Sequence, residues 1–283
     1  MTIKELHFKS VKKILPLYSK SEASYILNIF LCEFLNINKL KLSLSINETA
    51  TEELQDYIIN TLKRLLKNEP FQYILGNEAF YGYTFKVTED VLIPRPETEE
   101  LVEWVMQTVG EKEVQILDIG TGSACIPISL SKELNFAKVS ACDISLEALK
   151  IAEENNCNLD ANVFLFKLDI LNEKLWQSDV QYDVIVSNPP YIPNKEKALM
   201  SKNVLNFEPE LALFVKDDDA LIFYEKIADY AKTRLSENGF LFFECNEFNA
   251  KQVLKMLEKK QYSNIELRKD LCGRDRMIKA SFT

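Results

Sequence analysis

The stretch that decides the fold is Val114-Gln115-Ile116-Leu117-Asp118-Ile119-Gly120-Thr121-Gly122, an apolar run that ends in a glycine turn. An apolar run of this length predicts a buried strand, and a helix is expected from the turn to about residue 134. Similar runs recur down the chain, and helical patterns separate most of them. They predict strands at residues 138–142, 162–167, 182–187, 240–245, 262–269 and 275–282. This alternation predicts an α/β fold with a mostly parallel sheet covered by helices on both faces.

Two other regions precede this pattern. Residues 1–75 hold no glycine and carry apolar residues at helical spacing, which predicts a small helical bundle with Ser21 and Asn47 opening two of its helices. Residues 76–97 are rich in aromatic residues, glycine and proline, and they predict a hairpin linker. The α/β domain is expected to cover residues 98–283, beginning with a helix that Thr98 caps. Within it, residues 191–216 show no clear element, and loops of that length are usually functional.

The fourth predicted strand ends in Asn188-Pro189-Pro190-Tyr191. Because proline cannot continue a strand ladder, Asn188 is expected at the carboxyl end of that strand, where open α/β sheets bind ligands. The Asn188 side chain and the Pro189 carbonyl can both accept hydrogen bonds from an –NH2 group, and Tyr191 can stack on a planar amide or base. The turn therefore indicates transfer of a group to a planar nitrogen. A tight turn that only caps the strand is the alternative.

The glycine turn and an acidic residue together indicate a nucleoside ligand. Asp143 ends the second strand, 23 residues after Gly120, where a carboxylate can accept both ribose hydroxyls. Cys125 stands where the dinucleotide motif has its third glycine, which argues against NAD. Asp118 would repel a pyrophosphate but suits an ammonium group, so S-adenosylmethionine matches these residues best. Alternatively, Asp118 caps a helix and Asp143 lies in a loop.

The composition narrows the function classes. The chain has 283 residues, of which 47% are hydrophobic, and a formal net charge of −9, which argues against non-specific binding to nucleic acid. With His7 as its one histidine, the chain is not expected to form a His-based metal site or a Ser-His-Asp triad. No metal is expected. The six cysteines lack CxxC spacing and are expected to be reduced core residues. Without a signal peptide or an apolar run long enough to span a bilayer, the chain is expected to be cytoplasmic and free of membranes.

Several motifs resemble one family. Asp118–Gly122, Asp143 and Asn188–Tyr191 are similar to the corresponding motifs of class I methyltransferases that act on nitrogen. More specific segments resemble the release-factor glutamine methyltransferases, the PrmC or HemK family. These are Phe71-Gln72-Tyr73-Ile74-Leu75-Gly76, Phe80-Tyr81-Gly82, Ile93-Pro94-Arg95-Pro96-Glu97-Thr98-Glu99 and Asn206-Phe207-Glu208-Pro209.

The resemblance implies a Rossmann-like, seven-stranded catalytic domain and an amino-terminal domain that docks the release factor. It implies methyl transfer from S-adenosylmethionine to the glutamine amide nitrogen, N5, of the Gly-Gly-Gln motif. The catalytic residues would be Asn188, Pro189 and Tyr191. The residues implied for the cofactor are Asp118, Gly120, Thr121, Gly122, Ser123, Ala124, Asp143, Asp169, Ile170 and Asn188. The residues implied for the substrate are Asn188, Pro189, Pro190, Tyr191 and Arg95, although Arg95 could instead be a salt-bridge anchor.

Two rival functions use the same residues. A DNA or RNA adenine-N6 methyltransferase could hold the exocyclic amine of a flipped base in the Asn188 turn, but the acidic charge and the segments at 93–99 and 206–209 argue against it. A protein that binds S-adenosylmethionine or a release factor without catalysis is the other rival, and the intact Asn188–Tyr191 turn argues against that. The expected partner is a release factor, with no direct contact to nucleic acid, and the expected state is a monomer.

Overall fold

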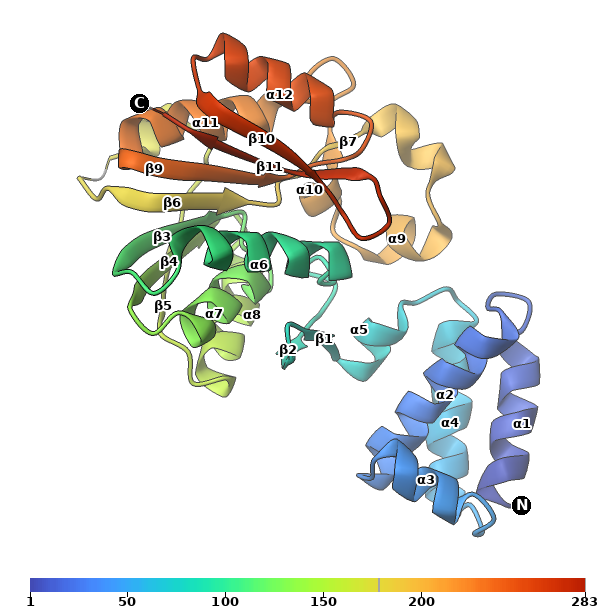
Figure 1. Cartoon of the computed structure of the whole chain (residues 1–283). Helices are drawn as coiled ribbons and strands as arrows, with labels where there is room; N and C mark the ends of the chain where they lie inside the picture. The colour runs from blue at the N-terminus through green and yellow to red at the C-terminus, as the bar shows by residue number, and fades with distance from the viewer. Residues whose placement is uncertain (178, 283) are drawn as a thin grey trace. The chain divides into compact units, whose positions relative to one another are not determined.

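The computed structural model describes residues 1–177 and 179–282, and the chain divides into two compact units (Figure 1). The smaller unit comprises Met1–Gly76 with Ser201–Phe207, and the larger comprises Asn77–Met200 with Glu208–Thr283. Ser178 and Thr283, both inside the segment 98–283 predicted to form the α/β domain, lie outside the described residues.

The smaller unit is helical and has its own core. Helix α1 begins with a capping box in which Thr2 and Glu5 satisfy each other's backbone N–H groups. Ser19, and not Ser21, caps α2, while Thr51 caps the helix expected to open at Asn47. The core side chains come from α1, α2, α3 and α4. The helices are α1 (Ile3–Ile14), α2 (Lys20–Leu35), α3 (Lys39–Ser45), α4 (Glu52–Leu65), α5 (Phe71–Leu75) and α9 (Lys202–Phe207).

A short hairpin opens the larger unit. Strands β1 (Asn77–Phe80) and β2 (Tyr83–Lys86) pair antiparallel, with Phe80 opposite Tyr83. The two residues between them, Tyr81 and Gly82, both have positive φ, as the twist of a two-residue hairpin turn requires. Beyond the hairpin, α6 (Pro96–Val109) begins with proline in its first turn.

Seven strands form the central sheet of the larger unit, in the order β10-β11-β9-β6-β3-β4-β5. The five strands from β9 to β5 pair in parallel, and β11 runs antiparallel to both β9 and β10. Chain order runs outward from β3 to β5 and then returns to β6 on the other side of β3, so the switch point for ligand binding lies between β3 and β6. The strands are β3 (Val114–Ile119), β4 (Ala137–Asp143), β5 (Val163–Lys167), β6 (Tyr182–Ser187), β9 (Leu235–Glu244), β10 (Ser263–Lys269) and β11 (Asp275–Ser281).

Helices cover both faces of this sheet, because neighbouring strand residues point to opposite sides. Ile116 and Val184 pack with α6, α7 (Cys125–Glu133) and α8 (Leu146–Asn158) in one buried cluster. Leu117 and Ile185, each one residue on, pack with α11 (Ile222–Arg234) and α12 (Ala250–Lys259) in a second cluster. Figure 1 shows the two helical layers on either side of the strands. The predicted fold class is confirmed.

The segment after the Asn188 turn is more ordered than expected. Where no clear element was predicted at 191–216, the structure has several short ones, each too short to give a periodic sequence signal. Elsewhere, η1 (Glu173–Leu175) is a single turn. No helix in the described ranges 1–177 and 179–282 is long and apolar enough to cross a membrane. The short elements at 191–216 are β7 (Ile192–Pro193), η2 (Asn194–Leu199), α9, α10 (Glu210–Leu213) and β8 (Phe214–Val215).

Candidate functional site

A cavity of about 310 Å³ lies at the carboxyl ends of the parallel strands, next to the switch point between β3 and β6. Most of the residues predicted for cofactor and substrate line it, although they come from separate stretches of the chain. Three predicted residues are absent from its lining: Asp118, Ala124 and Tyr191. The predicted residues that line it are Arg95, Gly120, Thr121, Gly122, Ser123, Asp143, Asp169, Ile170, Asn188, Pro189 and Pro190.

The glycine turn after β3 is fixed to the end of β4. The backbone N–H groups of Gly120 and Thr121 donate to the Cys142 carbonyl at 2.9 and 3.0 Å. Gly122 N–H donates to Asp143 Oδ2 at 2.9 Å. Gly120 and Gly122 have φ of 77° and 54°, a backbone region that side chains rarely adopt. The turn therefore presents bare backbone to the cavity beside the Asp143 carboxylate.

Ala124 adopts the same left-handed region at the start of α7. Its φ is 63°, and its side chain is fully buried. For a residue other than glycine, this conformation costs roughly 1–2 kcal/mol. The backbone at Ala124 thus takes a conformation that is typical of glycine. The methyl group points into the core and stays out of the cavity lining.

The Asp143 carboxylate can still accept hydrogen bonds from a ligand. Its Oδ2 accepts from Gly122 and its Oδ1 accepts from Ser145 N–H at 2.9 Å, which leaves further lone pairs on both oxygens. Burial raises the pKa of Asp143, and the N–H groups of Ser145 and Gly122 oppose that rise. A pair of hydroxyl donors such as a ribose offers would fit this carboxylate.

Asp118 is buried behind the turn. It is fully shielded from solvent, and neither carboxylate oxygen has a hydrogen-bond partner among the described residues. Burial raises the pKa of Asp118 from 3.8 to about 7; the nearby Thr121 hydroxyl opposes this rise, and the charge of Asp143 adds a smaller increase. Buried carboxylates without partners are rare and usually mark a ligand or a functional group. The site therefore suits a ligand that carries both a ribose and a cation, and S-adenosylmethionine is such a ligand.

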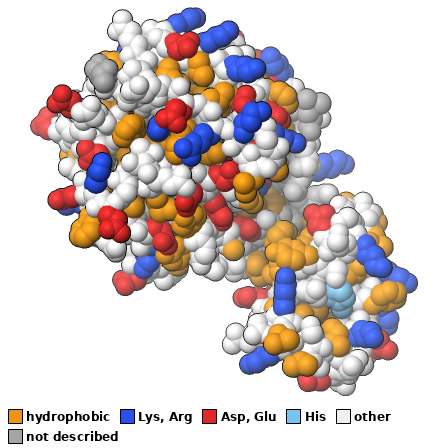
Figure 2. All heavy atoms as spheres, viewed as in Figure 1, with side chains coloured by type: hydrophobic (Ala, Val, Ile, Leu, Met, Phe, Trp, Pro, Cys, Tyr) orange, Lys and Arg blue, Asp and Glu red, His pale blue; other side chains and the backbone are white. Residues whose placement is uncertain are grey.

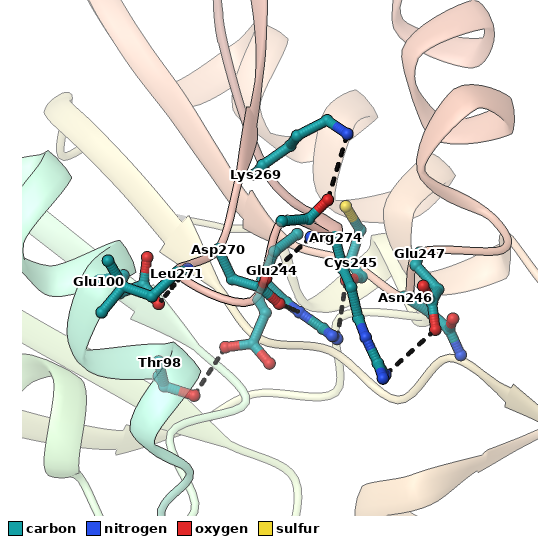
Figure 3. A network of polar contacts seen from close by, with 12 residues as sticks. Thr98, Glu100, Glu244, Cys245, Asn246, Glu247, Lys269, Asp270, Leu271 and Arg274 are labelled. Atoms are coloured by element: carbon teal, nitrogen blue, oxygen red, sulfur yellow. Dashed lines mark hydrogen bonds and ion pairs between the residues drawn. The ribbon is translucent and has the colours of Figure 1, made fainter.

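The Asn188 turn follows β6 and lines the cavity. The Ser187 hydroxyl donates to the Ile119 carbonyl at 2.7 Å and so ties the ends of these two strands together. Asn188 Nδ2 donates to Thr98 Oγ1 at 3.4 Å, and Thr98 Oγ1 donates to Glu244 Oε2 at 2.6 Å. Figure 3 shows Thr98 at the start of its helix, with its hydroxyl directed at Glu244. The prediction that Thr98 caps α6 is wrong, because the helix starts at Pro96 and Arg95 is its N-cap residue.

Arg95 lines the cavity and forms an ion pair with a buried carboxylate. Arg95 Nη2 donates to both Glu208 oxygens, at 2.6 and 2.7 Å, and the Glu208 side chain is only 1% exposed. This contact joins the two motifs at 93–99 and 206–209 that the sequence singled out. Pro209 and Leu211, just beyond Glu208, also line the cavity. The salt-bridge alternative for Arg95 is thus present in the structure.

Tyr191 lies away from the cavity lining. It packs against the cluster that includes α11 and α12, and burial raises its pKa. The structure therefore unites Asn188, Pro189 and Pro190 at the cavity but places Tyr191 to one side.

Sequence reasoning missed three polar residues that support the site. Glu244 ends β9, and its only sequence signal is a carboxylate that closes an apolar strand. For Thr98 the sequence predicts only a helix cap. Asn155 donates to the carbonyls of Ser123 and Lys86 at 2.9 and 3.0 Å, and so anchors the glycine turn to α8 and β2. Its signal is a polar residue on the apolar face of α8.

Comparisons with known proteins match both parts of the chain. The family described as the methyltransferase small domain matches residues 97–207, and the family described as the PrmC N-terminal domain matches residues 17–76. Among solved structures, the catalytic domain of hMettl16 in complex with MAT2A 3′UTR hairpin 1 has a TM-score of 0.59 at 17% identity, covering 92% of this chain and 91% of that one. A methyltransferase from Pyrococcus furiosus has a TM-score of 0.53 at 20% identity, covering 78% and 97%. These structures share the fold.

Two curated relatives are similar over nearly their full length. The release factor glutamine methyltransferase of Flavobacterium psychrophilum is 42% identical over 287 aligned residues, which cover 100% of both chains. That of Bacteroides thetaiotaomicron is 42% identical over 265 residues, covering 94% of this chain and 95% of the relative. The chain therefore belongs to the family of release factor glutamine methyltransferases.

Proposed function

We propose that this chain transfers the methyl group of S-adenosylmethionine to the side-chain amide nitrogen, N5, of the glutamine in the Gly-Gly-Gln motif of peptide chain release factors. The observation that carries the proposal is the position of Asn188 at the carboxyl end of β6, in the same cavity as the glycine turn and Asp143. Family membership supplies the substrate. The proposal includes a cytoplasmic enzyme that docks its substrate through residues 1–75.

The residues around the glycine turn are assigned to the cofactor. Backbone from Gly120 to Ala124 would hold the methionine part, and Asp118, which lies just outside the cavity lining, would partner its ammonium group after a local adjustment. Asp143 would accept the ribose hydroxyls, and Asp169 with Ile170 would flank the adenine. When bound, S-adenosylmethionine supplies a methyl group on a positively charged sulfur. The unpartnered carboxylate of Asp118 and the free lone pairs of Asp143 support these assignments.

The Asn188 turn is assigned to the substrate amide. An amide nitrogen is a weak nucleophile, because its lone pair is delocalised into the carbonyl. Asn188 Oδ1 and the Pro189 carbonyl would each accept a hydrogen bond from one of its N–H groups, which fixes the nitrogen and draws electron density toward it. When the nitrogen gains the methyl group, the C–S⁺ bond breaks to leave a neutral sulfide, and the nitrogen loses one of its two protons to solvent. Pro190 would hold the turn rigid, and Tyr191 would pack on the amide plane after a local adjustment. Positioning of this kind can supply on the order of 7–11 kcal/mol of the barrier.

The test is methyl transfer from labelled S-adenosylmethionine to a purified release factor. We expect label on the wild-type factor and none on its Gln→Ala variant in the Gly-Gly-Gln motif. Equal labelling of both factors would reject the glutamine as acceptor. Retention of cofactor without any transfer would instead make the chain a binding protein.

A duplex DNA in the same assay tests the adenine-N6 alternative, for which label on DNA alone would be the result. On the face drawn in Figure 2, Lys and Arg side chains are interspersed with Asp and Glu and form no single basic surface. With a formal net charge of −9, this favours a protein substrate.

A further inference from the structure

The proposed reaction depends on which end of the Asn188 carboxamide faces the substrate. One end accepts hydrogen bonds and the other donates them. Only Oδ1 can accept a hydrogen bond from the N–H group of the substrate amide. If the –NH2 end faced the substrate instead, two donors would face each other and no hydrogen bond would form. Oxygen and nitrogen are nearly the same size, so packing alone does not choose between the two orientations. Something with a fixed hydrogen-bond direction must make the choice.

Two residues from different elements, Thr98 of α6 and Glu244 of β9, lie beside this carboxamide. Ser187 pairs with Phe243 in the parallel ladder of β6 and β9, so Asn188 and Glu244 follow at the same edge of the sheet. Thr98, the third residue of α6, lies between them, with its hydroxyl 3.4 Å from Asn188 Nδ2 and 2.6 Å from Glu244 Oε2. The Thr98 and Glu244 side chains are buried, so water does not readily replace the contact between them, whereas the Asn188–Thr98 contact lies at the cavity lining.

The direction of the hydrogen bonds follows from the charge of Glu244. An ionised carboxylate only accepts, so Thr98 must donate its single hydroxyl proton to Glu244. Thr98 Oγ1 can then only accept, which requires the –NH2 end of Asn188 to face it. A reversed carboxamide would place Asn188 Oδ1 against an oxygen with no proton left to give. Oδ1 is thus left free on the other side.

We propose that Thr98, held by Glu244, is a positioning residue that fixes the Asn188 carboxamide with its oxygen free for the substrate amide. This inference rests on the proposed function of Asn188. Thr98 does not react, and it acts only through the orientation of its neighbour.

The surroundings of Glu244 permit the charged form that this arrangement needs. Burial raises the pKa of Glu244 to about 7, while the Thr98 hydroxyl and the Arg276 guanidinium favour the charged carboxylate. Assays at pH 8 therefore keep most of it ionised. The other titratable or charged groups that interact with it are Glu97, Arg95, Tyr191, Tyr224, Cys125 and Cys245.

The test compares Thr98→Val with Thr98→Ser at pH 8. Valine keeps the shape of threonine but has no hydroxyl, whereas serine keeps the hydroxyl and loses only a methyl group. With saturating cofactor and release factor, we expect T98V to lower kcat about ten-fold, the value of one orienting hydrogen bond, and T98S to stay near the wild type. The KM for release factor and the Kd for S-adenosylmethionine should change little in either variant.

Three results would overturn the inference. They are a kcat of T98V within about two-fold of the wild type, an equal loss in T98S and T98V, or a loss of cofactor affinity in T98V that matches its loss of kcat. The second would assign the effect to packing of the methyl group, and the third to damage of the fold. Failure of the proposed function looks different, because the wild-type enzyme would then transfer no label to the factor's glutamine.

Discussion

Asn188 is the residue whose removal separates chemistry from binding. Asn188→Ala deletes the proposed acceptor for the substrate N–H but leaves the glycine turn, Asp143 and the Ser187 contact in place. We expect kcat to fall by about 100-fold or more, a loss typical of a missing preorganised hydrogen bond at a reacting centre. The Kd for S-adenosylmethionine, measured by titration calorimetry, should stay near the wild-type value. An equal loss of affinity and turnover would contradict the assignment.

Asp118 makes the stability of the cofactor-free protein depend on pH. Its pKa is raised in the folded state from 3.8 to about 7, mainly by burial, so the fold favours the neutral carboxyl. Its stabilising contribution is therefore present below about pH 4 and is lost as the pH rises toward 7. Relative to Asp118→Asn, which does not titrate, the wild type should lose up to about 4 kcal/mol of unfolding free energy across this range.

Urea unfolding of the wild type and D118N at several pH values between 4 and 8 measures this difference. Parallel stability curves for the two proteins would show that Asp118 ionises as easily in the folded state as in the unfolded chain. Saturating S-adenosylmethionine should reduce the difference if its ammonium group partners the carboxylate.

At the scale of single residues, the sequence indicated which side chains gather at the site but not what each one contacts. Gly120, Asp143 and Asn188 were predictable because each follows a recognisable strand, and parallel strands end at a common edge. The role of Asp118 beside the cofactor stays a prediction, and strand alternation buries its side chain outside the cavity lining, which the sequence did not indicate. The Thr98–Glu244 bond joins residues 146 positions apart, and no local pattern reveals such a pair.

Among the elements, the segment around Glu208 is joined to the start of α6 by an ion pair with Arg95, whose two ends are unequally buried. The Glu208 side chain is 1% exposed and that of Arg95 is 34% exposed. Arg95→Ala leaves a buried carboxylate without this partner and should cost roughly 3 kcal/mol or more of unfolding free energy. Glu208→Ala leaves a guanidinium that reaches water, and it should cost less. Urea unfolding of the two variants measures the asymmetry.

The pair formed by Lys197 and Glu210, in the same segment, provides the control. The Glu210 side chain is 72% exposed, so Glu210→Ala should change stability by less than about 1 kcal/mol. Equal losses in R95A and E208A would show that the burial of Glu208 does not set the energetics of this contact.

The regular elements of the larger unit were predictable because long apolar runs and helical periodicity determine them. Most strands of the central sheet lie where these runs do, whereas β9 begins at Leu235, five residues before the start predicted for it. Helix starts were less certain, since Ser19 and Ser21 are equally good caps by type and only the structure selects Ser19. The short elements between 191 and 216 depend on contacts such as Asn194 Nδ2 to the Val215 carbonyl, at 3.0 Å, which no periodicity signals.

On the scale of the whole molecule, the two units have separate cores, which makes their roles separable by deletion. The larger unit carries two buried clusters of its own, and the core of the smaller unit is built from residues 3–65. If the smaller unit docks the release factor, removal of residues 1–75 should lower kcat/KM for intact factor by at least about ten-fold. A short peptide containing Gly-Gly-Gln should be methylated as before.

Cofactor affinity is the control for this deletion, because all residues that line the cavity belong to the larger unit. Unchanged kcat/KM for intact factor would remove the docking role.

The order of the strands in the sheet is also a property of the whole molecule, and the sequence did not predict it in detail. Periodicity locates strands, but the neighbours of each strand depend on contacts between distant segments such as Ile116 and Val184.

The placement of β3 beside β6 has a consequence for how the chain acquires its structure during synthesis. These central partners pair Ile116 with Val184, and β4 and β5 are made between them. Such distant pairing is slow, because a long loop must close, at a cost in chain entropy, before any stabilising contact can form. The helices of residues 1–76 have local contacts and leave the ribosome before the strands of the sheet, so they can fold while the sheet is still incomplete. The cavity needs residues as far along the chain as Ile227, and the Thr98–Glu244 contact beside it needs Glu244, so neither can be complete until most of the larger unit has been made.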